Sequence, residues 1–108
     1  MSEKSKQPTS ITFPVRRLQH SFSHAKDFGI MGNWNSVNRQ LFEDAIQQHV
    51  QDAPTQITGT YRGRIPVMHY FDAATTLWVA IDQDGKFVAG WALSKKQIEY
   101  LFGKGNVQ

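Results

Sequence analysis

The sequence contains no cysteine, which excludes disulfide bonds, thiolate metal sites and cysteine nucleophiles. A domain without cysteine tolerates oxidising and reducing compartments alike, so this absence leaves the compartment open. No apolar run approaches the ~18 residues that a membrane-spanning helix needs. The first eight residues also lack the apolar core of a secretory signal. We therefore expect neither membrane insertion by this domain nor a cleaved signal at its start.

Acidic residues are scarce near the start of the chain, where Glu3 is the only one before Asp27. The formal net charge of +3 mildly favours a polyanionic partner. Seven Phe, three Trp and three Tyr, with a hydrophobic fraction of 40%, favour a folded globule over disorder. The length of 108 residues predicts one domain with a modest core.

The chain divides into a short leader and one folded domain. Residues 1–10 are polar and contain Pro8, so we expect a disordered leader or linker there, followed by a single domain over residues 11–108. A first helix is expected from Val15 to about Lys26, ended by glycines. Asn35 or Ser36 would then cap a second helix that ends before Pro54. Its expected apolar stripe is Val37, Leu41, Phe42, Ala45, Ile46 and Val50.

From Thr55 onward the apolar pattern changes to the period of two that is typical of strands. The expected strands are 56–61, 65–71, 75–82 and 86–93. Residues Asp82–Gly85 give a strong turn signal between the last two strands. Phe87, Ala89, Trp91 and Leu93 are expected on one face. Ser94 and Gln97 form a capping box for a short last helix, which Gly103 should end, leaving a frayed tail.

These elements predict an α+β fold. The two N-terminal helices would pack on one face of a twisted four-stranded antiparallel meander, because such a sheet exposes one face unless helices cover it. The opposite face would form a partly open, concave platform. Small ribonucleases of the barnase and RelE kind use such a surface, although a fold alone does not establish a function.

The segment from His20 to Ile30 is the most informative part of the chain. It places His20 and His24 four residues apart, with Lys26 beside them and Arg16 and Arg17 just upstream. Histidine can both accept and donate a proton near neutral pH, and surrounding cations would suit a reaction on a phosphodiester. The spacing alone favours a plainer alternative, a short amphipathic helix that packs Leu18 and Phe22 and carries the histidines on its surface.

Four short segments, in order and with similar spacing, resemble the cytotoxic tRNase domain of the colicin D family. They are His24–Ile30, Gly59–Arg62, Tyr70–Phe71 and Gly85–Trp91. The resemblance implies a metal-independent ribonuclease in which His24 acts as general base or acid. It also implies that Trp91 lies near the active site, where it could stack on a base; a core position on the strand is the alternative.

The sequence departs from the family pattern beside His24. Ser21 and Ser23 stand where the family has lysines, and Ala89 replaces a family serine. Nearby cations such as Lys26 could substitute for the missing lysines. The candidate catalytic residues are His24, Lys26 and Trp91, and the candidate substrate contacts are Arg16, Arg17, Ser21, Ser23, Arg62 and Arg64. Arg62 and Arg64 flank a hairpin tip and could hold an RNA backbone or remain solvated.

The other histidines have less specific patterns. His20 could be a second proton carrier, whereas His69 lies among apolar strand residues and is expected in the core. His49 lies on the second helix and is expected to be structural. A His-x-x-x-His pair can bind zinc, but no glutamate follows His20 and no third ligand is evident. We therefore expect no metal site and no cofactor.

The resemblance implies an antibacterial toxin domain that cleaves tRNA, in the anticodon loop, and stops translation in the cytoplasm of a target cell. Such a domain is normally the C-terminal part of a larger secreted or delivered toxin, and the producer carries an acidic immunity protein that masks the basic site. One alternative is a non-catalytic RNA-binding module of the same fold. Another is a ribosome-dependent mRNA interferase of the RelE kind.

Overall fold

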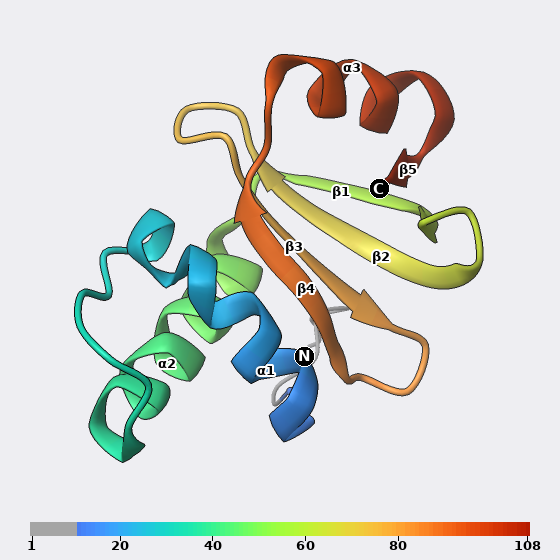
Figure 1. Cartoon of the computed structure of the whole chain (residues 1–108). Coiled ribbons are helices and arrows are strands. Elements are labelled where there is room, and N and C mark those ends of the chain that lie inside the picture. Colours follow the sequence, from blue (N-terminus) through green and yellow to red (C-terminus); the bar gives the residue numbers. More distant parts are fainter. Residues whose placement is uncertain (1–10) are drawn as a thin grey trace, which may run out of the picture.

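The computed structural model describes residues 11–108; the expected leader, residues 1–10, lies outside the described residues. A curled sheet has the N-terminal helices on one side and α3 on the other (Figure 1). The elements are α1 (Val15–Ser21), the 3₁₀ helix η1 (Phe22–Phe28), α2 (Ser36–Asp52), β1 (Thr55–Tyr61), β2 (Ile65–Asp72), β3 (Leu77–Asp82), β4 (Phe87–Ala92), α3 (Lys95–Lys104) and β5 (Asn106–Val107). The predicted α+β class is confirmed.

The first helix changes from α-helical to 3₁₀ geometry at Phe22, where the spacing of its apolar residues changes to three. Leu18 is fully buried in α1, and the chain then winds as a 3₁₀ helix from Phe22. Phe22, Ala25 and Phe28 recur every three residues, which places them on one face of a helix with three residues per turn. Both phenylalanine rings meet Phe42 of α2 edge-on, with centroids 5.7 and 5.5 Å away. The predicted helix from Val15 to about Lys26 is therefore present, but only Val15–Ser21 is α-helical and the rest is a 3₁₀ helix.

The second helix begins where the sequence indicates, because Asn35 Oδ1 accepts a hydrogen bond from the Asn38 N–H at 2.8 Å. Its buried line is narrower than the predicted stripe and consists of Phe42, Ile46 and Val50. Val37 and Leu41 remain 67% and 48% exposed, so the predicted apolar stripe is only partly buried. Only the residues spaced i, i+4, i+8 on one side of α2 are buried against the core, so Val37 and Leu41 face solvent.

The strands form a meander with the order β4-β3-β2-β1-β5, and the first four are antiparallel as predicted. β3 begins at Leu77, two residues later than expected. A register shift between Ala80 and Ile81 leaves Val88 without a partner residue. Since an extra residue reverses the alternation of side chains, Phe87 joins the core under the helices, whereas Ala89 lies on the opposite face.

The C-terminus is more ordered than the sequence suggests. The Ser94–Gln97 capping box is present as predicted, but α3 continues through Gly103 to Lys104 and is capped by Gly105, which has a φ of 69°. The following two residues form β5, which pairs in parallel with the end of β1. The predicted frayed tail was therefore wrong, because a strand of two residues has no periodicity to detect.

Two cores result from this arrangement. The first lies between the N-terminal helices and the sheet, and the second lies under α3, whose Leu101 is fully buried. The second core contains Tyr61, Val67, Phe71, Trp78, Ala80, Val88, Ala89, Leu93, Leu101 and Val107. The face expected to be an open platform is thus partly covered by α3, and the remaining open part lies beside β4 and the β1–β2 turn. No helix in the described part of the chain is long and apolar enough to cross a membrane.

Candidate active site

His24 is presented on the outer side of η1, against the tryptophan of β4. Its ring is exposed, and its centroid lies 5.4 Å from that of Trp91. Asp27, in the same 3₁₀ turn, accepts a hydrogen bond from the Ala92 N–H at 3.0 Å. This bond ties η1 to the end of β4 and so fixes the histidine beside the tryptophan.

Trp91 is held on its other sides. Its ring meets Trp78 edge-on with centroids 4.7 Å apart, and Tyr61 edge-on at 6.3 Å. Its indole N–H points to Gln97 Oε1 at 3.4 Å, and the same oxygen accepts the Ser94 N–H at 2.9 Å. The ring is half-buried. A fixed, half-exposed tryptophan beside an exposed histidine is compatible with both roles considered for Trp91, a position in the core and a position beside the active site.

A basic cleft lies next to this pair. It has a volume of about 250 Å³ and is lined by Arg16, Arg17, His20, Tyr61, Arg62, Ile65, Val88 and Ala89. Three of these residues are arginines and none is acidic. Ala89 lies two residues before Trp91 on β4 and faces the same side of the sheet, so the cleft and the His24–Trp91 pair are neighbours. A cleft with this lining suits a phosphate-bearing ligand.

Arg62 reaches the cleft from a tight turn between β1 and β2. Arg62 and Gly63 both have positive φ, 55° and 67°, as a type I′ turn requires. The Arg62 N–H donates to the Val107 carbonyl at 2.7 Å, and its guanidinium lies 5.2 Å from the centre of the Tyr61 ring. An arginine in this conformation is strained, and the strain persists because β5 holds the turn.

The Asn106 side chain stabilises the same β1–β2 turn through hydrogen bonds. The residue is buried, and its Oδ1 accepts hydrogen bonds from the Gly63 N–H at 2.8 Å and from the Thr60 hydroxyl at 2.9 Å.

We expect Asn106→Ala to lower the free energy of unfolding by about 1–3 kcal/mol, because it leaves both donors without a partner. Urea unfolding measures the change. Thr60→Val removes only one of the two bonds and should cost less; equal stability of Asn106→Ala and the parent would contradict this role.

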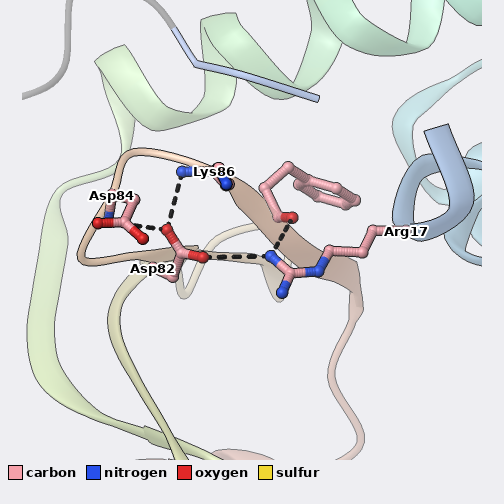
Figure 2. Close-up of polar contacts among 5 residues, drawn as sticks. Arg17, Asp82, Asp84 and Lys86 are labelled. Carbon is pink, nitrogen blue, oxygen red and sulfur yellow. Dashed lines mark hydrogen bonds and ion pairs between the residues drawn. The ribbon is translucent and has the colours of Figure 1, made fainter. Parts of the chain in front are cut away.

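Arg17 is engaged in the fold as well as in the cleft. Its guanidinium donates to the Asp82 carboxylate at 3.2 Å (Figure 2). It also donates to the Phe87 carbonyl at 3.3 Å. Partial burial alone would raise the pKa of Asp82. The N–H of Lys86, the Arg17 side chain and the N–H of Asp84 outweigh burial, so the pKa lies below its ordinary value. Arg17 therefore anchors α1 to the β3–β4 turn, and Arg16 and Arg62 are the more available cations of the cleft.

The structure brings together only some of the residues singled out from the sequence. His24 meets Trp91, and Arg16, Arg17 and Arg62 share the cleft with His20. Ser21 is 2% exposed, so we do not expect it to touch a substrate. The Ser23 hydroxyl donates to the His20 carbonyl at 3.4 Å.

Other parts of the site were placed or found only by the structure. Lys26 and Arg64 are exposed but do not line the cleft. Sequence reasoning missed the contributions of Tyr61, Gln97, Asn106 and Asp27. The capping box pointed to Gln97 only as part of a helix start.

The two other histidines are structural, as expected. His69 is fully buried; its Nδ1 accepts the Trp78 indole N–H at 2.9 Å, and its Nε2–H donates to the Gly105 carbonyl at 2.9 Å. Both bonds together require the neutral ring. Burial lowers the pKa of His69 more than the Gly105 carbonyl raises it. Burial likewise lowers the pKa of His49, which contacts the Tyr70 carbonyl.

These lowered values predict a loss of stability in mild acid. The unfolded chain binds protons more readily than the folded chain below the ordinary histidine pKa of about 6.5. The free energy of unfolding should therefore fall as the pH drops from about 7.5 to about 5.5. Urea unfolding at several pH values tests this, with the Asp82 contribution retained because its carboxylate titrates lower still. A free energy of unfolding that stays constant or rises over this range would contradict the neutral assignment.

Within residues 11–108, no group of three or more His, Asp or Glu side chains is arranged to hold a metal ion. The chemistry that this geometry supports is proton transfer by an exposed imidazole next to cations that can hold a phosphodiester. The sequence alone could suggest the histidine and the arginines, but only the fold shows that they are neighbours.

Comparison with known proteins finds similar sequences and a similar fold. The family model for colicin D matches residues 17–101. Colicin-D of Escherichia coli is 35% identical over 85 residues, which are 76% of this chain and 12% of that protein, so the chain spans about one eighth of its relative. A solved ribonuclease from Escherichia coli, complexed with its inhibitor protein, is 33% identical with a TM-score of 0.71 and covers 83% of this chain and 99% of that chain. The chain therefore belongs to the colicin D family.

Proposed function

We propose that this chain is a toxin domain that cleaves tRNA as a metal-independent endoribonuclease and thereby blocks translation. The observation that carries the proposal is the exposed His24 against Trp91, beside a cleft that is lined by three arginines and, within residues 11–108, by no carboxylate. Family membership and the ribonuclease fold support the substrate class. The anticodon loop is the proposed target, because its unstacked bases can reach an aromatic ring such as Trp91.

The proposed reaction is a transesterification within the RNA chain. His24 accepts the proton of a ribose 2′-hydroxyl, the 2′-oxygen attacks the adjacent phosphorus, and the bond to the 5′-oxygen breaks, leaving a cyclic phosphate. The guanidinium groups of Arg16 and Arg62 offset the charge that builds on the phosphate oxygens. DNA lacks the 2′-hydroxyl and cannot react in this way.

We also propose the biological setting. The domain forms part of a longer secreted or delivered toxin, since the matched relative is about eight times longer than the matched region. It acts in the cytoplasm of the target bacterium, where tRNA is found. An acidic inhibitor protein made by the producer would cover the basic cleft, as charge complementarity favours fast association.

Mapping RNA ends in cells tests the choice of substrate. After brief induction of the chain in a bacterium, sequencing of RNA ends should find new cuts concentrated in the anticodon loops of one or a few tRNAs. Cuts spread over messenger RNA and dependent on translation would instead favour a ribosome-dependent interferase. Growth arrest with no new RNA ends would refute both nuclease hypotheses.

A non-catalytic RNA-binding module is the second candidate, and one observation favours it. Ala89 lines the cleft where the family pattern has a serine, and Ser21 is buried where the pattern has a lysine. Such a module should bind tRNA in a salt-dependent manner without cutting it. A tRNA band that shifts on a native gel but stays intact would support this reading.

A further inference from the structure

His20 lies in the basic cleft, but the reaction proposed above assigns it no role. It is exposed at the end of α1 and lines the cleft together with three arginines and Tyr61. The reaction needs two proton transfers: one from the attacking 2′-hydroxyl and one to the departing 5′-oxygen. His24 supplies only the first of them.

The two histidines are placed on a common line along β4. His20 shares the cleft with Ala89, and His24 packs on Trp91, two residues further along the same face of the strand. Four residues of helix separate the two histidines along their own element, a rise of roughly 6–8 Å between α-helical and 3₁₀ geometry. Both histidines therefore flank the same short stretch of sheet surface.

This separation fits the width of a reacting phosphodiester. In an in-line displacement the entering and leaving oxygens lie on opposite sides of the phosphorus, and a hydrogen bond of about 3 Å joins each oxygen to its proton carrier. A phosphate between the two imidazoles, held by Arg16 and Arg62, would place one oxygen near each ring.

We propose that His20 is a second catalytic residue, which donates its proton to the leaving 5′-oxygen. This inference rests on the proposed nuclease function. The bond from the 2′-oxygen to phosphorus forms as its proton passes to His24, and the bond from phosphorus to the 5′-oxygen breaks as that oxygen takes the proton of His20. His24 ends protonated and His20 neutral, and exchange with water restores both.

The other polar groups of the cleft fit this role less well. Arg16, Arg17 and Arg62 are poor candidates, because a guanidinium group holds its proton too tightly to give it to a leaving oxygen. Tyr61 is 8% exposed, and its ring packs on Trp78 and Trp91. Its hydroxyl is the one rival donor in the cleft, so Tyr61→Phe belongs in the test.

A sulfur substitution in the RNA separates acid catalysis from other roles. Once the cut is mapped, a synthetic stem-loop of that tRNA carries sulfur in place of the leaving 5′-oxygen; a thiolate leaves without help from an acid. We expect His20→Ala to slow cleavage of the ordinary stem-loop about 10²-fold or more and to cleave the sulfur-containing stem-loop within a few-fold of the parent. His24→Ala should be slow on both substrates. Urea unfolding of each variant controls for folding.

Several results would overturn the proposal. One is cleavage of the ordinary stem-loop by His20→Ala at the parent's rate. Another is an equal loss on both substrates, which would indicate a positioning role only. Rescue by sulfur in Tyr61→Phe rather than in His20→Ala would assign the acid to Tyr61. A parent protein that cuts neither stem-loop would refute the nuclease function itself, and the acid role with it.

Discussion

His24→Ala is expected to reduce tRNA cleavage by about 10²–10⁴-fold, the range that a positioned general acid or base contributes. The loss should appear as a lower rate at saturating tRNA, since the imidazole acts on the proton in transit and the arginines remain to bind the phosphate. Single-turnover cleavage of tRNA, followed on denaturing gels, measures it.

The fold should survive this substitution, because the His24 side chain is exposed and its ring packs on the surface of Trp91. The free energy of unfolding should change by no more than about 0.5 kcal/mol. Gln19→Ala is a matched control: it is exposed on α1 and does not line the cleft, so its cleavage rate should equal that of the parent. Normal cleavage by His24→Ala would remove this residue from the mechanism.

Among the glycines, Gly59 is the one whose replacement by alanine we expect to destabilise the fold most. A Cβ at this position would lie 1.8 Å from the Gly105 carbonyl oxygen and 2.8 Å from its carbon, and both atoms belong to the backbone. That oxygen accepts hydrogen bonds from the Thr60 N–H at 2.8 Å and from His69 at 2.9 Å. Moving Gly105 aside would break both bonds and the pairing of β5.

The cost should therefore be about 3 kcal/mol or more, from overpacking and the lost hydrogen bonds together. Urea unfolding should show a clearly lower midpoint, or no folded protein at all. Gly103→Ala is the matched control, since its Cβ meets nothing within 4 Å and the residue is helical. We expect Gly103→Ala to be neutral or stabilising by up to about 1 kcal/mol. Similar stability of the two variants would contradict the close approach of β1 and Gly105.

Local patterns predicted most of the fold. The period of two gave the four meander strands, and side-chain capping located the start of α2 at Asn35 and of α3 at Ser94. The misses came from geometry that short patterns do not carry. A three-residue spacing of Phe22, Ala25 and Phe28 reads as part of an α-helix until packing on α2 tightens it. The bulge at Val88 is one extra residue, and no local sequence signal marks it.

The site could be predicted in part for similar reasons. The family segments pointed to His24 and Trp91, and charge pointed to the arginines. The supporting contacts join residues far apart in the sequence, as when Asn106 fixes the turn at Gly63 or Asp27 fixes the end of β4. Hydrogen bonds of this kind leave no periodicity, so only the folded chain shows them. Nor does a local pattern show that the helix turns Ser21 inward, since His20 beside it is exposed.

The most direct test of the account is to incubate the purified chain with total bacterial tRNA in EDTA and to determine the ends of any fragments. We predict discrete fragments in which one end is a cyclic phosphate and the other a 5′-hydroxyl, produced by the parent and not by His24→Ala. Intact tRNA under these conditions, bound but uncut, would contradict metal-independent catalysis by this cleft and leave a binding module as the better description.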